Sequence, residues 1–258
     1  MFIWAATSRK YRSCRKASSM LWEHAETKDC ALSSINFPHY NLLMTKTTDS
    51  TIQVRRSADR FHSDLGWLDS RHTFSFGNHH DPAFMGFKAL RVINDDRVAP
   101  NQGFGEHGHA GMEIISYVIS GQLQHRDSMG NGHIIEPGQF QYMSAGTGVR
   151  HSEFNPPKTE PVHFLQIWIT PRDGHTKPRY EERSMNELPA DGSLTLVASA
   201  DGRDGSIAIH QDVIMSFGHL ASGEAVRPTT PDSHHWVHVI SGKIQVHGET
   251  LSPGDGAA

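Results

Sequence analysis

The 258-residue chain is long enough to bury the core of one large domain or of two modest ones. It carries 24 Lys and Arg against 28 Asp and Glu, with no clustered basic stretch beyond its first few dozen residues, which argues against direct nucleic-acid binding. No apolar run approaches the roughly 20 residues that a membrane span requires, and the opening MFIWAA does not fit a signal peptide. The only cysteines, Cys14 and Cys30, precede the patterned region, so we expect a cytoplasmic protein without a disulfide framework.

Residues 1–50 mix Lys, Arg, Ser, Cys and aromatic residues without a helical or alternating period. We therefore predict a poorly ordered N-terminal extension, with Met44 as an alternative start that would leave residues 1–43 outside the protein. Because this segment lacks a pattern able to bury apolar area, deleting residues 1–43 should leave folding and metal content unchanged.

From Thr51 onward the chain consists of short segments of β-forming residues separated by Gly, Pro, Asn and Asp turns, which is typical of a sandwich or barrel. One segment, RYEERSMNEL at residues 179–188, favours a helix, and residues 179–190 are predicted to be a linker. The predicted strands are FKALRVI, EIISYVIS, GQLQHR, GQFQYMS, HFLQIWIT, LTLVAS, IAIHQDVIMSF and WVHVISGKIQVHG.

An internal repeat divides this region into two halves. YVISGQLQ (residues 117–124) recurs as HVISGKIQ (residues 238–245), and EPGQF near Pro137 recurs as SPGDG near Pro253. The repeat predicts two related barrels, at residues 51–178 and 191–258.

Two pairs of residues indicate a metal site in the first barrel. Side chains on a strand alternate between faces, so His107 and His109 point the same way, as do His151 and Glu153 in RHSEFN. A single histidine on a strand is usually a surface or packing residue, but two such pairs can direct four ligands at one point. Three imidazoles and a carboxylate suit a divalent first-row metal and leave coordination positions open. GFGEHG at residues 103–108 fits a dinucleotide-binding template, but a strand-like run follows it instead of a helix, so no nucleotide cofactor is expected.

The combined pattern resembles the two cupin motifs, whose fold is a small jelly-roll barrel. More closely, four stretches resemble pirin and particularly its bacterial quercetinase-type relatives, over roughly residues 52–258. The cupin-motif positions are Gly103 or Gly105, His107, His109, Glu113 and Gly121, then Gly138, Gly146, His151 and Asn155. The pirin-like stretches are RHTFSFGNHHDP, RVINDDRVAP, HGHAGMEIISYVISGQLQHRDSMGN and MSAGTGVRHSEFNP.

This resemblance implies an all-β bicupin whose N-terminal barrel binds one divalent metal through His107, His109, His151 and Glu153. We expect Fe(II) ahead of Ni, Mn, Co, Cu or Zn. Other cupins use the acidic residue at the position of Glu113 as a ligand but pirins do not, so we expect Glu113 to lie behind the ligands.

The chain ends at SPGDGAA, where pirins continue through further strands, so the C-terminal barrel, residues 191–258, is predicted to be incomplete. It is also predicted to bind no metal, because aligning the VISG repeats places Pro228 opposite His107 and Thr230 opposite His109, and neither replaces an imidazole. His234, His235 and His238 lie nearby and could recruit zinc.

Family members either cleave the flavonol quercetin with O2 or act as nuclear transcription cofactors, so membership leaves two functions open. Our leading hypothesis is a quercetin 2,3-dioxygenase-type enzyme, a monomer that binds a small aromatic substrate and O2. Glu153 would be both ligand and general base, and Phe74–Phe76 and Met112 are candidates to line the pocket. The alternative is a non-catalytic regulator with a structural or redox-sensing metal, which binds a partner protein.

Overall fold

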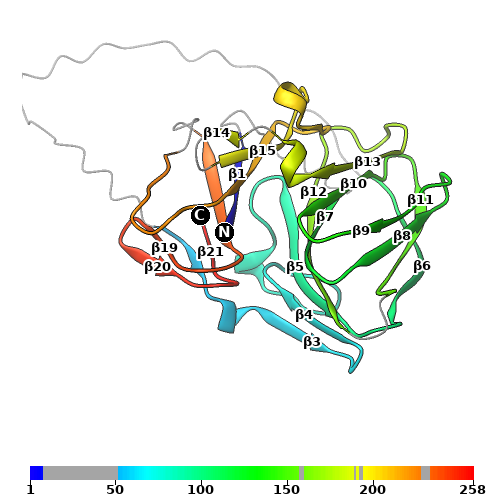
Figure 1. Ribbon diagram of the computed structural model, residues 1–258, viewed down its shortest axis with the longest axis horizontal. Helices are drawn as coiled ribbons and strands as arrows, with labels where there is room; N and C mark the ends of the chain where they lie inside the picture. Colours follow the sequence, from blue (N-terminus) through cyan, green and yellow to red (C-terminus); the bar gives the residue numbers. More distant parts are fainter. Residues whose placement is uncertain (8–51, 157–159, 189, 192–193, 228–232) are drawn as a thin grey trace, which may run out of the picture. The chain divides into compact units, whose positions relative to one another are not determined.

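The computed structural model describes residues 1–7, 52–156, 160–188, 190–191, 194–227 and 233–258 (Figure 1). The described residues all belong to one compact unit. The described part is built of strands, as predicted, and no helix in it is long and apolar enough to cross a membrane. Its helical segments are the 3-10 turns η1 (Ser57–Asp59), η2 (Pro82–Phe84), η3 (Met185–Glu187) and η4 (Arg203–Gly205).

The first barrel consists of two antiparallel sheets. The larger, in spatial order, contains β13 (Arg179–Ser184), β10 (Gln139–Ser144), β7 (Glu113–Ser120), β12 (Val162–Ile169), β5 (Leu90–Val98), β4 (Leu68–His72) and β3 (Phe61–Asp64). The smaller contains β6 (Gly103–His109), β11 (Val149–Phe154), β8 (Leu123–Asp127) and β9 (Gly132–Ile135).

The second barrel contains one large sheet and a two-stranded ribbon. The sheet has the order β14 (Ala190–Asp191), β15 (Leu194–Ser199), β17 (Val213–Gly218), β1 (Phe2–Thr7), β18 (His234–Val239), β21 (Gly256–Ala257) and β2 (Val54–Arg55), with β16 (Ile207–Ala208) paired to β15. The ribbon contains β19 (Ile244–Val246) and β20 (Glu249–Leu251). The internal repeat has a structural counterpart, because both VISG segments join the end of one strand to the next, β7 to β8 and β18 to β19.

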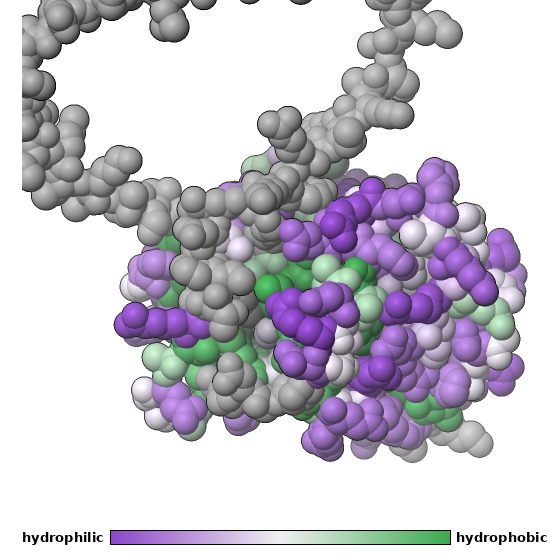
Figure 2. All heavy atoms as spheres, turned by 90° about the horizontal axis from the view of Figure 1, so that it is seen from above, coloured by the Kyte–Doolittle hydropathy of each residue, from purple (hydrophilic) through white to green (hydrophobic). Residues whose placement is uncertain are grey.

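Alternation along β7 divides its apolar side chains between two clusters. On β7, Ile115 and Tyr117 face an apolar cluster that also contains Phe217 and Trp236 of the second barrel, so this cluster joins the two barrels. Val118 instead belongs to a cluster inside the first barrel, together with Leu123 and Phe164. With apolar side chains directed inward, the outer surface of the first barrel is largely hydrophilic in the view of Figure 2, on its right-hand side.

The structure differs from the predicted boundaries at three places. RYEERS forms strand β13, paired with β10 of the first barrel, and η3 is the one helical turn among the described residues of the predicted linker. The charged side chains of β13 are half-buried, which suits the outermost strand of a sheet, whereas the sequence pattern suggested a solvated helix. Strand β2 pairs with β21, so residues 54–55 belong to the sheet of the second barrel. The third difference concerns the N-terminus.

The prediction of a poorly ordered extension is wrong for residues 2–7, which form β1 in the middle of the second barrel's sheet. β1 pairs antiparallel with both β17 and β18, so its backbone groups take part in two ladders. Phe2 packs into the second barrel, and Ile3 packs into the cluster that both barrels share. The sequence pattern did not reveal this strand because a central strand is apolar on both faces and MFIWAA therefore shows no alternation.

Two local contacts fix the position of β1. A Cβ atom at Gly218 would lie 2.1 Å from the ring of Phe2, so only glycine leaves room for this ring on the neighbouring strand. The N-terminal ammonium donates to the carbonyl of Ser241 at 2.8 Å, in the VISG turn of the second repeat. The predicted dispensability of residues 1–43 therefore does not hold for β1. The remainder of the predicted extension, residues 8–50, lies outside the described residues, and the dispensability of residues 8–43 stays a prediction.

Deleting residues 2–7 should destabilise the protein by several kcal/mol, because the deletion removes buried apolar side chains and leaves β17 and β18 each without one of its two ladder partners. Ile3→Asp should lower the free energy of unfolding by about 3 kcal/mol or more, since it places an unpaired carboxylate in the shared core. Ile3→Val is the matched control and should cost about 1 kcal/mol. Urea-induced unfolding measures the free energy of unfolding of the deletion variant and of both Ile3 variants. An unchanged midpoint after the deletion would contradict the role assigned to β1.

Candidate metal centre

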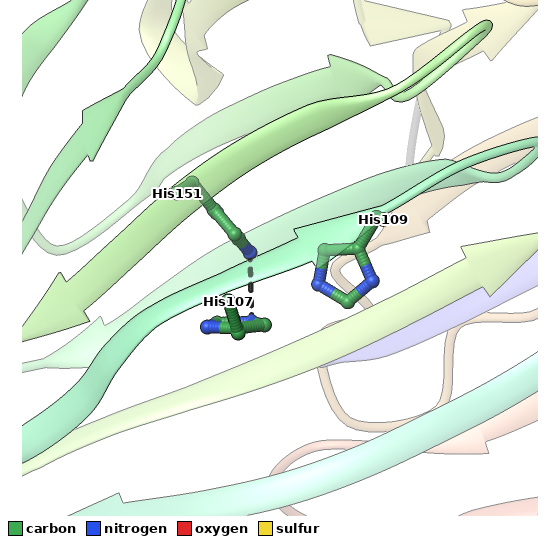
Figure 3. A group of neighbouring side chains, drawn as sticks. All are labelled: His107, His109 and His151. Atoms are coloured by element: carbon green, nitrogen blue, oxygen red, sulfur yellow. Dashed lines mark hydrogen bonds between the residues drawn. The ribbon is translucent and has the colours of Figure 1, made fainter.

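Three histidines converge inside the first barrel. β6 and β11 pair antiparallel, and their register places His151 directly opposite His107, while His109 lies two residues along β6 on the same face. The ligand nitrogens of the three rings all lie within 4.8 Å of one another (Figure 3). The Nε2 atoms of His107 and His151 are 3.0 Å apart. The structure thus brings together three of the four predicted ligands.

Hydrogen bonds to the outer ring nitrogens leave the inner nitrogens available for a metal. Nδ1 of His107 lies 2.8 Å from the carbonyl oxygen of Gly105 and therefore carries the proton. Nδ1 of His151 lies 3.2 Å from Nε2 of the buried His125. Both rings can therefore present an unprotonated Nε2 to the space between them, which is the usual arrangement of histidines that bind metals.

Burial keeps the imidazoles of His109 and His151 neutral near pH 7. It lowers the pKa of His109 to about 4, helped by His151 and His107, and lowers the pKa of His151 to about 4, helped by His107. A neutral imidazole is the form that coordinates a metal, so near pH 7 these two rings need lose no proton to bind one. The donor set and the protonation states both fit a divalent first-row ion.

Glu153, the fourth predicted ligand, is only 1% exposed and lies two residues beyond His151, after an irregularity in the pairing of β11 with β6. Its carboxylate accepts hydrogen bonds across the barrel, from Gln166 at 2.8 Å and Ser116 at 3.3 Å. Burial raises its pKa, although those hydrogen bonds and the nearby His125 and His107 oppose the shift. Glu153 lines the same cavity as His107 and His109, but the three-histidine group does not include it, so its ligation stays a proposal.

His107 and His109 line a cavity of about 220 Å³ between the two sheets of the first barrel. Its walls combine apolar rings with polar side chains from β4, β5 and β12. The apolar lining consists of Leu68, Phe76, Phe104 and Trp168, and the polar lining of Ser70, His72, Asn94, Asp96 and Gln166 as well as His107, His109 and Glu153. The cavity can therefore hold an aromatic group against aromatic walls, with its polar atoms near the histidines.

Polar residues that were not predicted as site residues lie in or beside the cavity wall. His72, Asn94, Gln166 and Ser116 occupy one cross-strand row on β4, β5, β12 and β7. Asp96, in the stretch RVINDDRVAP, lines the cavity, and burial together with Glu153 raises its pKa to about 7. The sequence signal for this row was the presence of polar residues at inward positions of otherwise apolar strands, but it could be recognised only once the register was known.

Three expectations about neighbouring residues need revision. Phe76 lines the cavity, but Phe74 packs against Trp236 in the shared core, and Met112 packs with a separate apolar cluster. Glu113 does not lie behind the ligands. Its carboxylate accepts from Tyr142, Ser144 and His210, none of which lines the cavity. Glu113 was expected behind the ligands because it matches the acidic position of the cupin motif. Strand alternation instead directs its side chain to the face of β7 that carries Ile115 and Tyr117, away from the cavity.

Pro228 and Thr230, which the repeat aligned with His107 and His109, lie outside the described residues. The expectation that the second barrel binds no metal therefore stays a prediction.

His125→Phe should weaken metal binding by about 10- to 100-fold, because it removes the hydrogen-bond partner of His151 Nδ1 while keeping a ring against Tyr180. The matched control is His133→Phe, which lies opposite His125 on β9 and stacks on the same tyrosine but has no contact with the cluster. Chelator competition measures the affinity. Equal losses in the two variants would contradict a specific role of His125.

Comparison with known proteins identifies the architecture. The profile of the pirin family matches residues 52–169, and that of the quercetinase C-terminal cupin domain matches residues 196–258. The chain is 46% identical over 208 residues to the quercetin 2,3-dioxygenase of Escherichia coli K12, covering 80% of this chain and 89% of that protein. A putative quercetin 2,3-dioxygenase of Mycobacterium tuberculosis H37Rv is 40% identical over 210 residues, covering 80% of this chain and 85% of that protein. The crystal structure of the Escherichia coli pirin YhhW in complex with nickel(II) superposes with a TM-score of 0.75 at 46% identity, over 80% of this chain and 89% of that one. The chain therefore belongs to the pirin family of bicupin proteins.

Proposed function

We propose that this protein is a metal-dependent dioxygenase that opens the ring of a flavonol, such as quercetin, with O2. The observation that carries the proposal is the group of three converging histidines, two of which line a cavity with aromatic sides. The relatives that bear the name quercetin 2,3-dioxygenase support the reaction type.

The metal would be held by His107, His109, His151 and Glu153. When bound, a divalent ion would act as a Lewis acid toward the oxygen atoms of the flavonol and orient the substrate beside O2. Imidazole and carboxylate donors with open positions suit Fe(II), which we propose as the resident metal. The nickel(II) complex of YhhW supports a divalent ion in this family.

The apolar walls would bind and orient the substrate. Trp168 lies edge-on to His109 with 5.0 Å between ring centroids, and Phe76 lies edge-on to Trp168 at 5.5 Å. A planar aromatic ring beside these side chains would displace water from the histidines.

Glu153 would accept the hydroxyl proton of the flavonol. Gln166 donates to the Glu153 carboxylate and itself accepts from the Trp168 indole at 3.1 Å, so the cavity wall orients the carboxylate. Burial favours the protonated form of Glu153, which makes the ionised carboxylate a stronger base than an exposed glutamate.

The direct test loads the purified protein with Fe(II), Ni(II), Mn(II), Co(II), Cu(II) or Zn(II) separately and adds quercetin. We expect coupled O2 uptake and carbon monoxide release with at least one metal. The His109→Ala variant should bind less metal and lose turnover in proportion. Metal content is determined by elemental analysis, and the native protein should contain iron at about one equivalent per chain. Absence of turnover with every metal would refute the dioxygenase and favour the metal-containing regulator that binds a partner protein.

Glu153→Gln tests the base role, because glutamine keeps the shape and one oxygen donor but cannot take up the proton. Turnover per bound metal should fall by about 100-fold or more, while much of the metal is retained. Glu106→Gln is the control, since Glu106 is an exposed carboxylate on β6 next to His107. Near-normal turnover per metal in Glu153→Gln would contradict the base role.

A further inference from the structure

A second polar cavity, of about 430 Å³, lies where the outer face of the first barrel meets the second barrel. The first barrel contributes residues of β4, β5 and β12, and the second contributes residues around β18 and the turn before β21. Its charged and titratable lining consists of Arg60, Arg71, Asp95, Arg97, His163 and His238. None of these residues belongs to the metal centre.

The lining has an excess of positive charge. The lining contains three arginines, Arg60, Arg71 and Arg97, but one carboxylate, that of Asp95. Asp95 accepts from Arg60 and Arg97, each at 3.2 Å, and from His163 at 2.7 Å. Arg71 has only a long approach to the exposed Asp69, at 3.9 Å. Gathering cations in a cavity costs free energy unless an anion accompanies them.

Two buried residues of the lining have polar atoms without a partner. Arg60 is 6% exposed, and its Nε and Nη1 atoms make no hydrogen bond among the described residues. His238 is 1% exposed, and neither of its ring nitrogens has a partner in that part of the chain. Burial lowers the pKa of His238 to about 3, assisted by Arg60, so the ring is neutral and retains one N–H donor. Buried donors without acceptors are rare, and each needs an explanation.

Apart from Ser57, the remaining lining is apolar and includes Ile119, Leu165, Val239 and Ile240. A ligand that satisfies the whole cavity therefore combines an anionic head with a compact apolar body. Guanidinium groups form their strongest hydrogen bonds with oxyanions such as carboxylates.

We propose that the cavity between the two barrels is a binding site for a small aromatic or aliphatic carboxylate, separate from the metal centre. The carboxylate would be held by Arg60, Arg97 and the N–H of His238, and its apolar body would lie against Leu165, Val239 and Ile240. The ligand would also stabilise the contact between the barrels, because both of them contribute to the site.

Isothermal titration calorimetry with benzoate tests this site, with benzamide as a neutral probe of the same shape. We expect one benzoate per chain with a Kd below about 1 mM and binding of benzamide at least tenfold weaker. Arg97→Gln and Arg71→Gln, both at partly exposed positions, should weaken benzoate by about tenfold while leaving the unfolding midpoint nearly unchanged. Arg203→Gln is the matched control, because Arg203 is similarly exposed and lies outside the cavity, and it should have no effect.

A carboxylate could also bind a metal, so the titration is repeated on His107→Ala, which should retain benzoate affinity. Loss of binding in His107→Ala, equal affinity for benzoate and benzamide, or unchanged affinity in both Arg97→Gln and Arg71→Gln would overturn the proposal. Binding of phenyl phosphate without binding of benzoate would overturn the choice of a carboxylate. These measurements report binding and not turnover, so their outcome is independent of the dioxygenase activity.

Discussion

The pairing of β6 with β11 is the constraint on which the candidate metal centre depends. Its register sets His151 opposite His107, and the alternation along β6 adds His109 to the same face. The strands approach so closely at Gly103 that a Cβ atom there would lie 2.2 Å from the carbonyl oxygen of Glu153. Glycine at this position therefore permits the close approach next to the irregularity that lies between His151 and Glu153. A shift of one residue in the pairing register of these strands would turn the histidines to the outside of the barrel.

The polar interior of the first barrel follows from this geometry. A carboxylate buried opposite the larger sheet requires donors, and Ser116 and Gln166 supply them from β7 and β12. Gln166 is in turn oriented by Trp168, which also contacts His109. Residues that bind the Glu153 carboxylate, shape the cavity and contact the three histidines are thus parts of one hydrogen-bonded and packed network, and a substitution at one of them affects the others.

The two barrels are joined as one folded unit by their shared apolar cluster and by β1. β1 connects the first residues of the chain to a sheet whose other strands, apart from β2, come from beyond residue 189. Such long-range pairing is slow to form but buries a strand on both faces. The cavity lined by Arg60 and His238 lies at the same junction, so an anion bound there would act on the contact between the barrels.

Much of this protein could be predicted from the sequence, because strand periodicity and repeat spacing are local properties. The all-β class and the two pairs His107/His109 and His151/Glu153 follow from alternation and turn residues, and the two related barrels follow from the internal repeat. The roles of β1, β13, Asp96, His125 and the Arg60 cavity could not be predicted in this way. Each depends on which distant strands become neighbours, and a central strand such as MFIWAA has no alternation that reveals its partners. The sequence alone determined which side chains share a strand face, whereas tertiary pairing decided which faces meet, because hydrogen bonding between strands is set by register and not by local pattern.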